Sequence, residues 1–299
     1  MEETAITFSE ALQVMFTGLF LSFFTSFFAW KKGFYRLSEG SEDSTDKTTP
    51  KLPLFAVLIP FAIFLALSIL IVPLIFVVGL SLYERSVAIS PQTVVLMSSV
   101  SIVINFIALL IFYFCLNQNN RNLIKGEYFG PTTSFRKTLS DISIGVLTWF
   151  ISFPVVMVAG KVVYMILYSF GFEVTPNQVA VSQVQISLES PYLFSFIALD
   201  VALLVPFVEE FLFRGCLQTW MRGKIGVNKA ILLTSIVFSS FHFSTSQGLG
   251  NIELLVSLMI LSCFLGFIYE KQRSLLASIS LHAFFNAVTV IMILFSTPY

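Results

Sequence analysis

Eight apolar segments, each of about the length that spans a bilayer, follow one another along this sequence. They cover residues 9–30, 53–82, 93–116, 142–170, 192–222, 229–246, 252–269 and 275–297. About 20 apolar residues cross the hydrocarbon core as a helix, and the backbone polar groups in lipid must be satisfied within the segment. The pattern therefore predicts an all-α fold, a polytopic transmembrane helix bundle of about eight helices.

Composition excludes an ordinary soluble domain. The chain is 56% hydrophobic and only 11% charged, whereas soluble domains carry about 25% charged residues. Lipid must therefore cover much of the exterior. The formal net charge of zero gives no indication of a nucleic-acid partner. Cys115, Cys216 and Cys263 lie in or beside apolar segments and form neither a disulfide framework nor a metal-binding spacing.

Basic residues fall in every second loop, and this pattern predicts how the chain is oriented. Lys and Arg favour cytoplasmic loops. The basic loops are 31–51, 117–137, 222–229 and 270–274. Both termini are therefore expected outside, in a multi-pass integral membrane protein that lies in the cell membrane if the source is bacterial. The first segment is expected to be a membrane span and not a cleaved signal, because acidic residues precede it.

Three features of the connections and segments carry further expectations. The loop 31–51 is expected to be polar and flexible, and the connector 171–191 to carry a short surface helix. Pro60 and Pro73 lie inside the second apolar segment and predict a kink there.

Glu209, Glu210 and Arg214 lie inside the fifth apolar segment. Ionisable groups in hydrocarbon are expensive, so such a cluster indicates a functional site. The only two histidines, His242 and His282, follow in later apolar segments. At a rise of about 1.5 Å per residue, Glu209 and both histidines lie roughly 14–20 Å from basic residues at the cytoplasmic ends of their segments. We therefore expect them to meet in one layer of the membrane, together with an amide that lies one turn after His282.

That amide belongs to Asn286, and helical spacing places it on the face of His282. The two residues are four apart, as are Phe238 and His242, and residues at this spacing are neighbours on a helix surface. Phe238 is thus expected to form an aromatic wall beside His242.

The two glutamates are predicted to have different roles. Glu210 precedes Arg214 by four residues, the favourable order for an ion pair on a helix. Adjacent residues on a helix point about 100° apart, so Glu209 and Glu210 do not share a face. Glu210 is therefore expected to pair with Arg214 and support the helix, which leaves Glu209 to face the histidines.

Two further charges, Lys161 and Asp200, lie at similar depths in the fourth and fifth segments. An unpaired charge at that depth costs several kcal/mol. We expect the two to form a structural ion pair, with Asp200 facing roughly away from Glu209.

The predicted cluster has the groups that peptide hydrolysis needs: a base, a water and donors for the oxyanion. In the favoured assignment Glu209 is the base, His242 shares or orients the water, and His282 with Asn286 donates to the oxyanion. In the alternative, Glu209, His242 and His282 bind a divalent metal such as zinc. The metal-free assignment is favoured because the sequence lacks a His-Glu-x-x-His motif.

Three motifs resemble those of the CPBP family, which comprises type II CAAX prenyl endopeptidases and bacteriocin-processing or Abi relatives. They are Glu-Glu-x-x-x-Arg at 209–214, Phe-x-x-x-His at 238–242 and His-x-x-x-Asn at 282–286. The resemblance covers about 204–291 and implies a catalytic core in the last four helices. It divides the chain into N-terminal transmembrane helices of unknown role, 1–191, and a protease core, 192–299. It also implies that Glu209 and His242 activate water while His282 and Asn286 form the oxyanion site.

The sequence is therefore interpreted as that of an intramembrane endopeptidase acting on a membrane-associated or lipid-modified peptide or protein. A prenylated tail and a bacteriocin-like leader are the candidate substrates, reached from the cytoplasmic side. The alternative is a catalytically silent Abi-like membrane protein that acts as a bacteriocin-immunity factor or scaffold. A proton- or ion-coupled transporter is a third hypothesis.

Overall fold

A computed structural model describes residues 8–37, 52–83, 90–129, 134–172 and 179–296, and every regular element in this part of the chain is a helix. The first half contains α1 (Phe8–Lys31), α2 (Phe55–Leu65), the π-helix η1 (Ala66–Ile71), α3 (Val72–Tyr83), α4 (Pro91–Cys115), α5 (Gln118–Phe129) and α6 (Phe135–Ser169). The second contains α7 (Val179–Ser187), α8 (Pro191–Leu199), the π-helix η2 (Asp200–Leu204), α9 (Val205–Glu210), the π-helix η3 (Phe211–Gln218), α10 (Thr219–Ile225), α11 (Val227–Ser240), the 3₁₀-helix η4 (Thr245–Gln247), α12 (Gly250–Gln272) and α13 (Leu275–Ser296).

Seven helical stretches of the described chain are long and apolar enough to cross a membrane. They coincide with seven of the eight apolar segments and confirm the polytopic helical bundle. The remaining segment forms α11, which has only 14 residues. At about 1.5 Å per residue α11 is roughly 21 Å long, shorter than the ~30 Å of a bilayer core.

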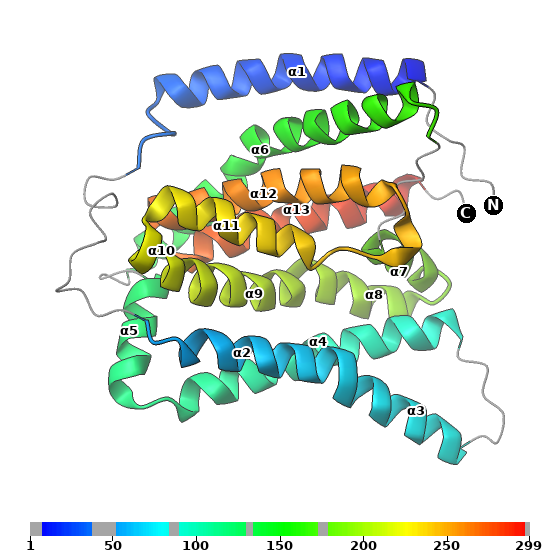
Figure 1. The fold of residues 1–299 in the computed structure, drawn as a ribbon, viewed down its shortest axis with the longest axis vertical. Helices are drawn as coiled ribbons and strands as arrows, with labels where there is room; N and C mark the ends of the chain where they lie inside the picture. Colours follow the sequence, from blue (N-terminus) through cyan, green and yellow to red (C-terminus); the bar gives the residue numbers. More distant parts are fainter. Residues whose placement is uncertain (1–7, 38–51, 84–89, 130–133, 173–178, 297–299) are drawn as a thin grey trace.

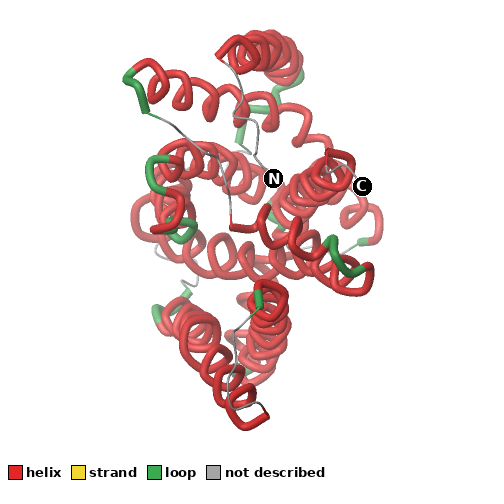
Figure 2. The backbone as a smooth tube through the Cα atoms, turned by 90° about the vertical axis from the view of Figure 1, so that its right-hand side faces the viewer, coloured by secondary structure: helices red, strands yellow, loops and turns green. Residues whose placement is uncertain are grey.

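The helices lie in layers, as Figure 1 shows. The pair α1 and α6 forms one side of the molecule, and α2, α3 and α4 form the other. Between them lie α12, α13, α11 and the continuous stretch from α8 to α10, with α6 packed directly on both α12 and α13. Figure 2 shows the same bundle turned by 90°. The last helices of the chain are thus the centre of the bundle, enclosed by the helices that precede them.

Two of the π-helical stretches come directly before a proline. η1 ends at Ile71, two residues before Pro73, and η2 ends at Leu204, two residues before Pro206. Proline lacks an N–H and clashes with the carbonyl four residues earlier, so the preceding turn widens. The kink expected from Pro73 therefore takes the form of a π turn.

Two glycines of α6 permit its close contact with the central helices. A Cβ on Gly145 would lie 2.3 Å from the carbonyl oxygen of Ala277 in α13. A Cβ on Gly160 would lie 2.6 Å from Ser257 Oγ in α12. Neither position accepts a side chain without moving the partner helix, so α6 is held against both.

The basic ends of the helices lie together at one end of the bundle. Lys31, Arg136, Arg222 and Arg273 stand at or beside the ends of α1, α6, α10 and α12. The opposite end carries α7 (Figure 1). α7 is the short helix that the sequence indicated in the connector 171–191. It packs on α4, α8 and α13, and its Val179 is 46% exposed while its Val184 is 2% exposed. Most of the predicted flexible loop, residues 38–51, lies outside the described residues.

We expect Gly145→Ala to destabilise the protein. The added methyl group would overlap a backbone carbonyl of α13, and overpacking of this kind typically costs about 1–3 kcal/mol. Thermal unfolding of the purified protein in detergent measures the loss. Gly79→Ala is the matched control, because nothing lies within 4 Å of its Cβ position. Equal stability of the two variants would contradict the close contact.

The orientation predicts opposite labelling of two loops. Ser246, after α11, and Asn119, at the start of α5, are both exposed and lie at opposite ends of the bundle. In a Cys115→Ser background and intact cells, a membrane-impermeant maleimide should label Ser246→Cys but not Asn119→Cys. Permeabilised cells, in which both sites should react, provide the control. The reverse result in intact cells would invert the orientation.

Candidate active site

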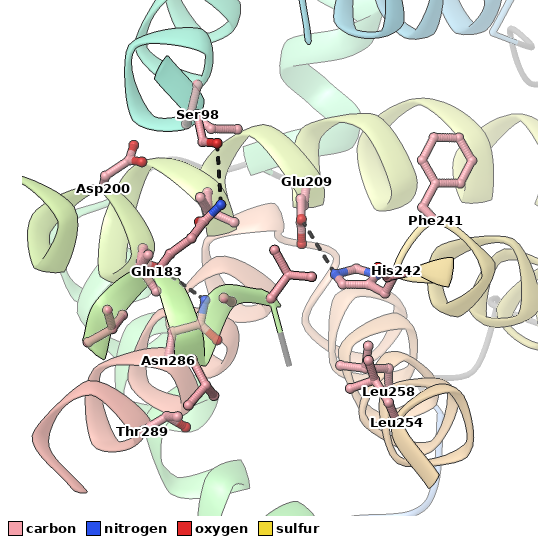
Figure 3. Close-up of a pocket in the computed structure, with 18 of the residues that line it drawn as sticks. Ser98, Gln183, Asp200, Glu209, Phe241, His242, Leu254, Leu258, Asn286 and Thr289 are labelled. Atoms are coloured by element: carbon pink, nitrogen blue, oxygen red, sulfur yellow. Dashed lines mark hydrogen bonds and ion pairs between the residues drawn. The ribbon is translucent and has the colours of Figure 1, made fainter. Parts of the chain in front are cut away.

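Glu209, at the end of α9, faces both histidines of the chain. Its Oε1 lies 3.8 Å from His242 Nε2, and its Oε2 lies 3.8 Å from His282 Nε2. Figure 3 shows the Glu209 and His242 side chains pointing toward each other. The fold therefore brings together three side chains from distant parts of the sequence. The first, Glu209, and the last, His282, are 73 positions apart.

His242 does not lie within a helix, contrary to the predicted span 229–246. α11 ends at Ser240, and His242 sits in the turn that follows. Its Nδ1 lies 3.0 Å from the carbonyl oxygen of Phe238, one of the acceptors that a helix C-terminus leaves without an intrahelical donor. The side chain of Asn251 then holds the chain by three hydrogen bonds, to the N–H and carbonyl of Ser244 and the carbonyl of Gly248. The imidazole of His242 and the amide of Asn251 thus provide hydrogen-bond partners for backbone groups that lie at or beyond the end of α11.

Glu210 has three side-chain partners, one on η3 and two on α13. Its Oε1 accepts from Arg214 at 2.8 Å and lies 2.8 Å from His282 Nδ1, and its Oε2 accepts from Ser278. Arg214 also donates to the carbonyl and hydroxyl of Ser262 in α12. Glu210 and Arg214 are both 0% exposed, so the pair neutralises two charges that have no access to water.

Aromatic contact completes the support of this pair. The Arg214 guanidinium lies 4.7 Å from the ring centroid of Phe238, which lies 4.9 Å from His242 and 6.0 Å from His282. Phe238 is thus the wall that the spacing predicted, and it touches both imidazoles. Sequence reasoning missed Ser262 and Ser278, because small hydroxyl residues at helix crossings have no distinctive spacing.

The hydrogen bonds determine which imidazole nitrogen faces Glu209. A backbone carbonyl only accepts, so His242 Nδ1 carries a proton, and a carboxylate acceptor places one on His282 Nδ1 as well. In each neutral ring Nε2 then carries a lone pair. Both Nε2 atoms face Glu209, whose buried Oε2 has no hydrogen-bond partner among the described residues. Three acceptors thus converge on a position where a donor such as water would satisfy them.

Asn286 lines a cavity that opens beside Glu209, and its side chain also forms a hydrogen bond to the backbone. Its Nδ2 donates to the carbonyl oxygen of Val201 at 2.9 Å. In η2 the N–H of Val205 bonds to the carbonyl five residues earlier, at Asp200. The next N–H in that ladder would belong to Pro206, which has none, so the Val201 carbonyl is left for Asn286. The second N–H of the amide remains available for a ligand.

A cavity of about 800 Å³ opens beside Glu209. Its walls come from several helices of both halves of the chain and include Ser68, Ser98, Gln183, Asp200, His282 and Asn286. It extends from Glu209 toward α7 and the first turns of α4 and α12, away from the basic ends of the helices. The site is therefore the inner end of a cavity and not an isolated buried cluster.

The predicted ion pair between Lys161 and Asp200 is wrong. Lys161 Nζ lies 3.2 Å from Glu253 Oε1 in α12, and Asp200 Oδ2 accepts from Ser99 Oγ at 2.7 Å. Gly160 allows α6 to pack closely on α12 beside Lys161. The acidic residue within reach of Lys161 is therefore Glu253 on α12. Asp200 faces α4 instead. Depth along two helices indicated a pair, but it did not indicate which helices are neighbours.

The donor set at Glu209 has the chemistry that zinc prefers, one carboxylate and two imidazoles. Among the described residues, however, no group of three His, Cys, Asp or Glu is arranged to hold a metal ion. If a metal binds, Glu209, His242 and His282 are the residues that would hold it.

The fold and the site define a polytopic helical membrane protein with a carboxylate and two imidazoles at the end of a buried cavity. Residues 191–288 match the family described as type II CAAX prenyl endopeptidase Rce1-like. This match to the last third of the chain supports the resemblance to the CPBP family that its three motifs predict. The match begins at the first residue of α8. The search of curated proteins finds no match, and neither does the search of solved structures.

A double-mutant cycle tests the pairing of Lys161. Lys161→Met and Glu253→Gln should each destabilise the protein by about 1–3 kcal/mol, because each leaves a mostly buried charge unpaired. The double variant should lose little more than the worse single variant, which thermal unfolding in detergent measures. The same cycle with Lys161→Met and Asp200→Asn should be additive. Coupling to Asp200 instead of Glu253 would contradict the structure.

Proposed function

We propose that this protein is an intramembrane endopeptidase that hydrolyses a peptide bond with a water activated by Glu209. The observation that carries the proposal is the convergence of Glu209 with two imidazole Nε2 atoms, each 3.8 Å away. That separation exceeds a direct hydrogen bond, and it suits a small donor held between the groups. The family match supports a protease.

In the proposed reaction the water oxygen attacks the carbonyl carbon while Glu209 takes a proton from the water. His242 Nε2 accepts the second hydrogen of the same water and orients it, because its Nδ1–H is held by the Phe238 carbonyl. Collapse of the tetrahedral intermediate breaks the C–N bond, and Glu209 returns its proton to the leaving amine. The products are an amine and a carboxylic acid, which keeps the water oxygen and its second hydrogen. No step of this reaction requires a metal, and we favour the metal-free mechanism because the sequence lacks a His-Glu-x-x-His motif.

The oxyanion needs donors, and the two predicted residues differ in what they can offer. Asn286 has one N–H left after its bond to Val201. His282 donates from Nε2 only in its doubly protonated form, because its Nδ1–H already serves Glu210. We therefore propose Asn286 as the oxyanion donor in the neutral site, and His282 as a second donor when it is protonated.

The proposed substrate is a membrane-associated peptide or protein segment, with a prenylated tail or a bacteriocin-like leader as candidates. The sequence indicated access from the cytoplasmic side. The cavity extends away from the basic helix ends, so the same orientation rule supports entry from the other side of the membrane. We propose that second route, which the labelling of Ser246 and Asn119 also helps to test.

Glu209→Gln should abolish peptide cleavage while the protein remains folded. The amide is nearly isosteric but cannot accept the proton, and a general base typically contributes a factor of about 10²–10⁴ to the rate. His242→Ala should have a similar effect. The assay follows cleavage of hydrophobic peptides in detergent, with prenylated and unmodified tails compared side by side.

Glu189→Gln is the control for removing a carboxylate. Glu189 is exposed, bonds to Gln92 and lies outside the cavity, so this variant should cleave at the wild-type rate. Wild-type cleavage by Glu209→Gln would refute the proposal. Absence of cleavage by the wild type itself, with all tails, would favour the catalytically silent alternative. Loss of cleavage on adding a chelator, restored by zinc, would favour the metal assignment over the metal-free one.

A further inference from the structure

Asp200 is a carboxylate in the cavity wall that the proposed reaction does not use. It is 3% exposed, and Ser99 donates to its Oδ2. Its Oδ1 has no hydrogen-bond partner, and within the described chain no Lys, Arg or His pairs with it. A buried carboxylate oxygen without a donor costs free energy, and such an atom in a native structure calls for an explanation.

The surroundings of Asp200 belong to the same cavity as Glu209. Ser98 and Gln183 line it beside Asp200, and Gln183 donates to Ser98 at 3.3 Å. Figure 3 shows Asp200 and His242 on opposite sides of Glu209. Nine residues separate Asp200 from Glu209, about 13 Å along the helix at ~1.5 Å per residue. A peptide that lies in the cavity can therefore reach both carboxylates.

We propose that Asp200 is a specificity subsite that binds a cationic side chain, Lys or Arg, of the peptide whose bond is cleaved at Glu209. The proposal rests on the proposed function. An ammonium or guanidinium group would give Asp200 Oδ1 the charged donor it lacks. The apolar wall residues Val201 and Val205 suit the aliphatic stem of such a side chain.

The separation defines where the basic residue belongs. An extended peptide advances about 3.3 Å per residue, so ~13 Å corresponds to roughly four residues. The preferred substrate therefore carries Lys or Arg about four positions to one side of the scissile bond. A solitary carboxylate with one serine donor is not a metal-ligand set, so a side-chain cation fits it better than a metal ion does.

The test scans lysine and norleucine through each position within five residues of the cleaved bond in a peptide that the full-length protein cleaves. Norleucine keeps the aliphatic stem and removes the charge. In the wild type, lysine at one position roughly four residues away should raise kcat/KM at least about tenfold over norleucine. In Asp200→Asn this ratio should fall to about one, because the variant no longer presents a negative charge to the lysine side chain. Absence of any lysine preference in the wild type overturns the subsite without need of a variant, as does a preference that survives Asp200→Asn.

Asp141→Asn is the matched control. Asp141 is also a buried carboxylate, but it pairs with Lys137 and lies outside the cavity, so the lysine preference should persist.

A peptide-binding measurement tests the Asp200 subsite independently of the proposed peptidase function. The two peptides are titrated against Glu209→Gln and against Glu209→Gln with Asp200→Asn. Tighter binding of the lysine peptide that depends on Asp200 supports the subsite even if the wild type cleaves neither peptide, in which case only the proposed function fails. Cleavage without lysine preference removes the subsite and leaves the proposed function standing.

Discussion

The carboxylate of Glu210 joins three parts of the chain inside the bundle. It accepts hydrogen bonds from Arg214 on η3 and from His282 and Ser278 on α13, while Arg214 reaches on to Ser262 in α12. Neither Glu210 nor Arg214 reaches water, so removing one of the two would leave the charge of the other buried and uncompensated. The same contacts set the ring of His282, and they leave Glu209, one residue earlier, free to face the cavity. Because Arg214 pairs with Glu210, the carboxylate of Glu209 has no arginine partner among the described residues and faces the two histidines.

The site forms where regular helix stops. Pro206 removes one N–H from the ladder that η2 begins, and Asn286 takes the carbonyl that this leaves. α11 ends at Ser240, and the imidazole of His242 takes a carbonyl of its last turn. Non-helical backbone at membrane depth is tolerated where it lines a cavity or is buried in protein. The residues proposed for the chemistry therefore also satisfy the backbone around them, which fixes their orientation.

The helices before residue 191 take part in the site although the three motifs lie outside them. Ser68, Ser98 and Gln183 line the cavity together with Glu209 and His282, and α6 packs along both α12 and α13 through Gly145 and Gly160. A boundary near residue 191 thus separates the motifs from the rest of the sequence, but the cavity walls come from both sides of it. The proposed substrate subsite at Asp200 faces one of these earlier helices, α4, through Ser99.

The sequence by itself determined the features that depend on position along one helix. The apolar segments, the pairing of Glu210 with Arg214 four residues on, and the wall formed by Phe238 beside His242 all follow from spacing within a segment. Tertiary structure alone decided which helices are neighbours and where a helix ends. Lys161 therefore met Glu253 and not Asp200, His242 came to lie in a turn, and Nδ1 of each histidine was committed to a neighbouring acceptor. A periodic pattern reports the face and depth of a residue, whereas contacts across the bundle depend on the packing of side chains from distant segments.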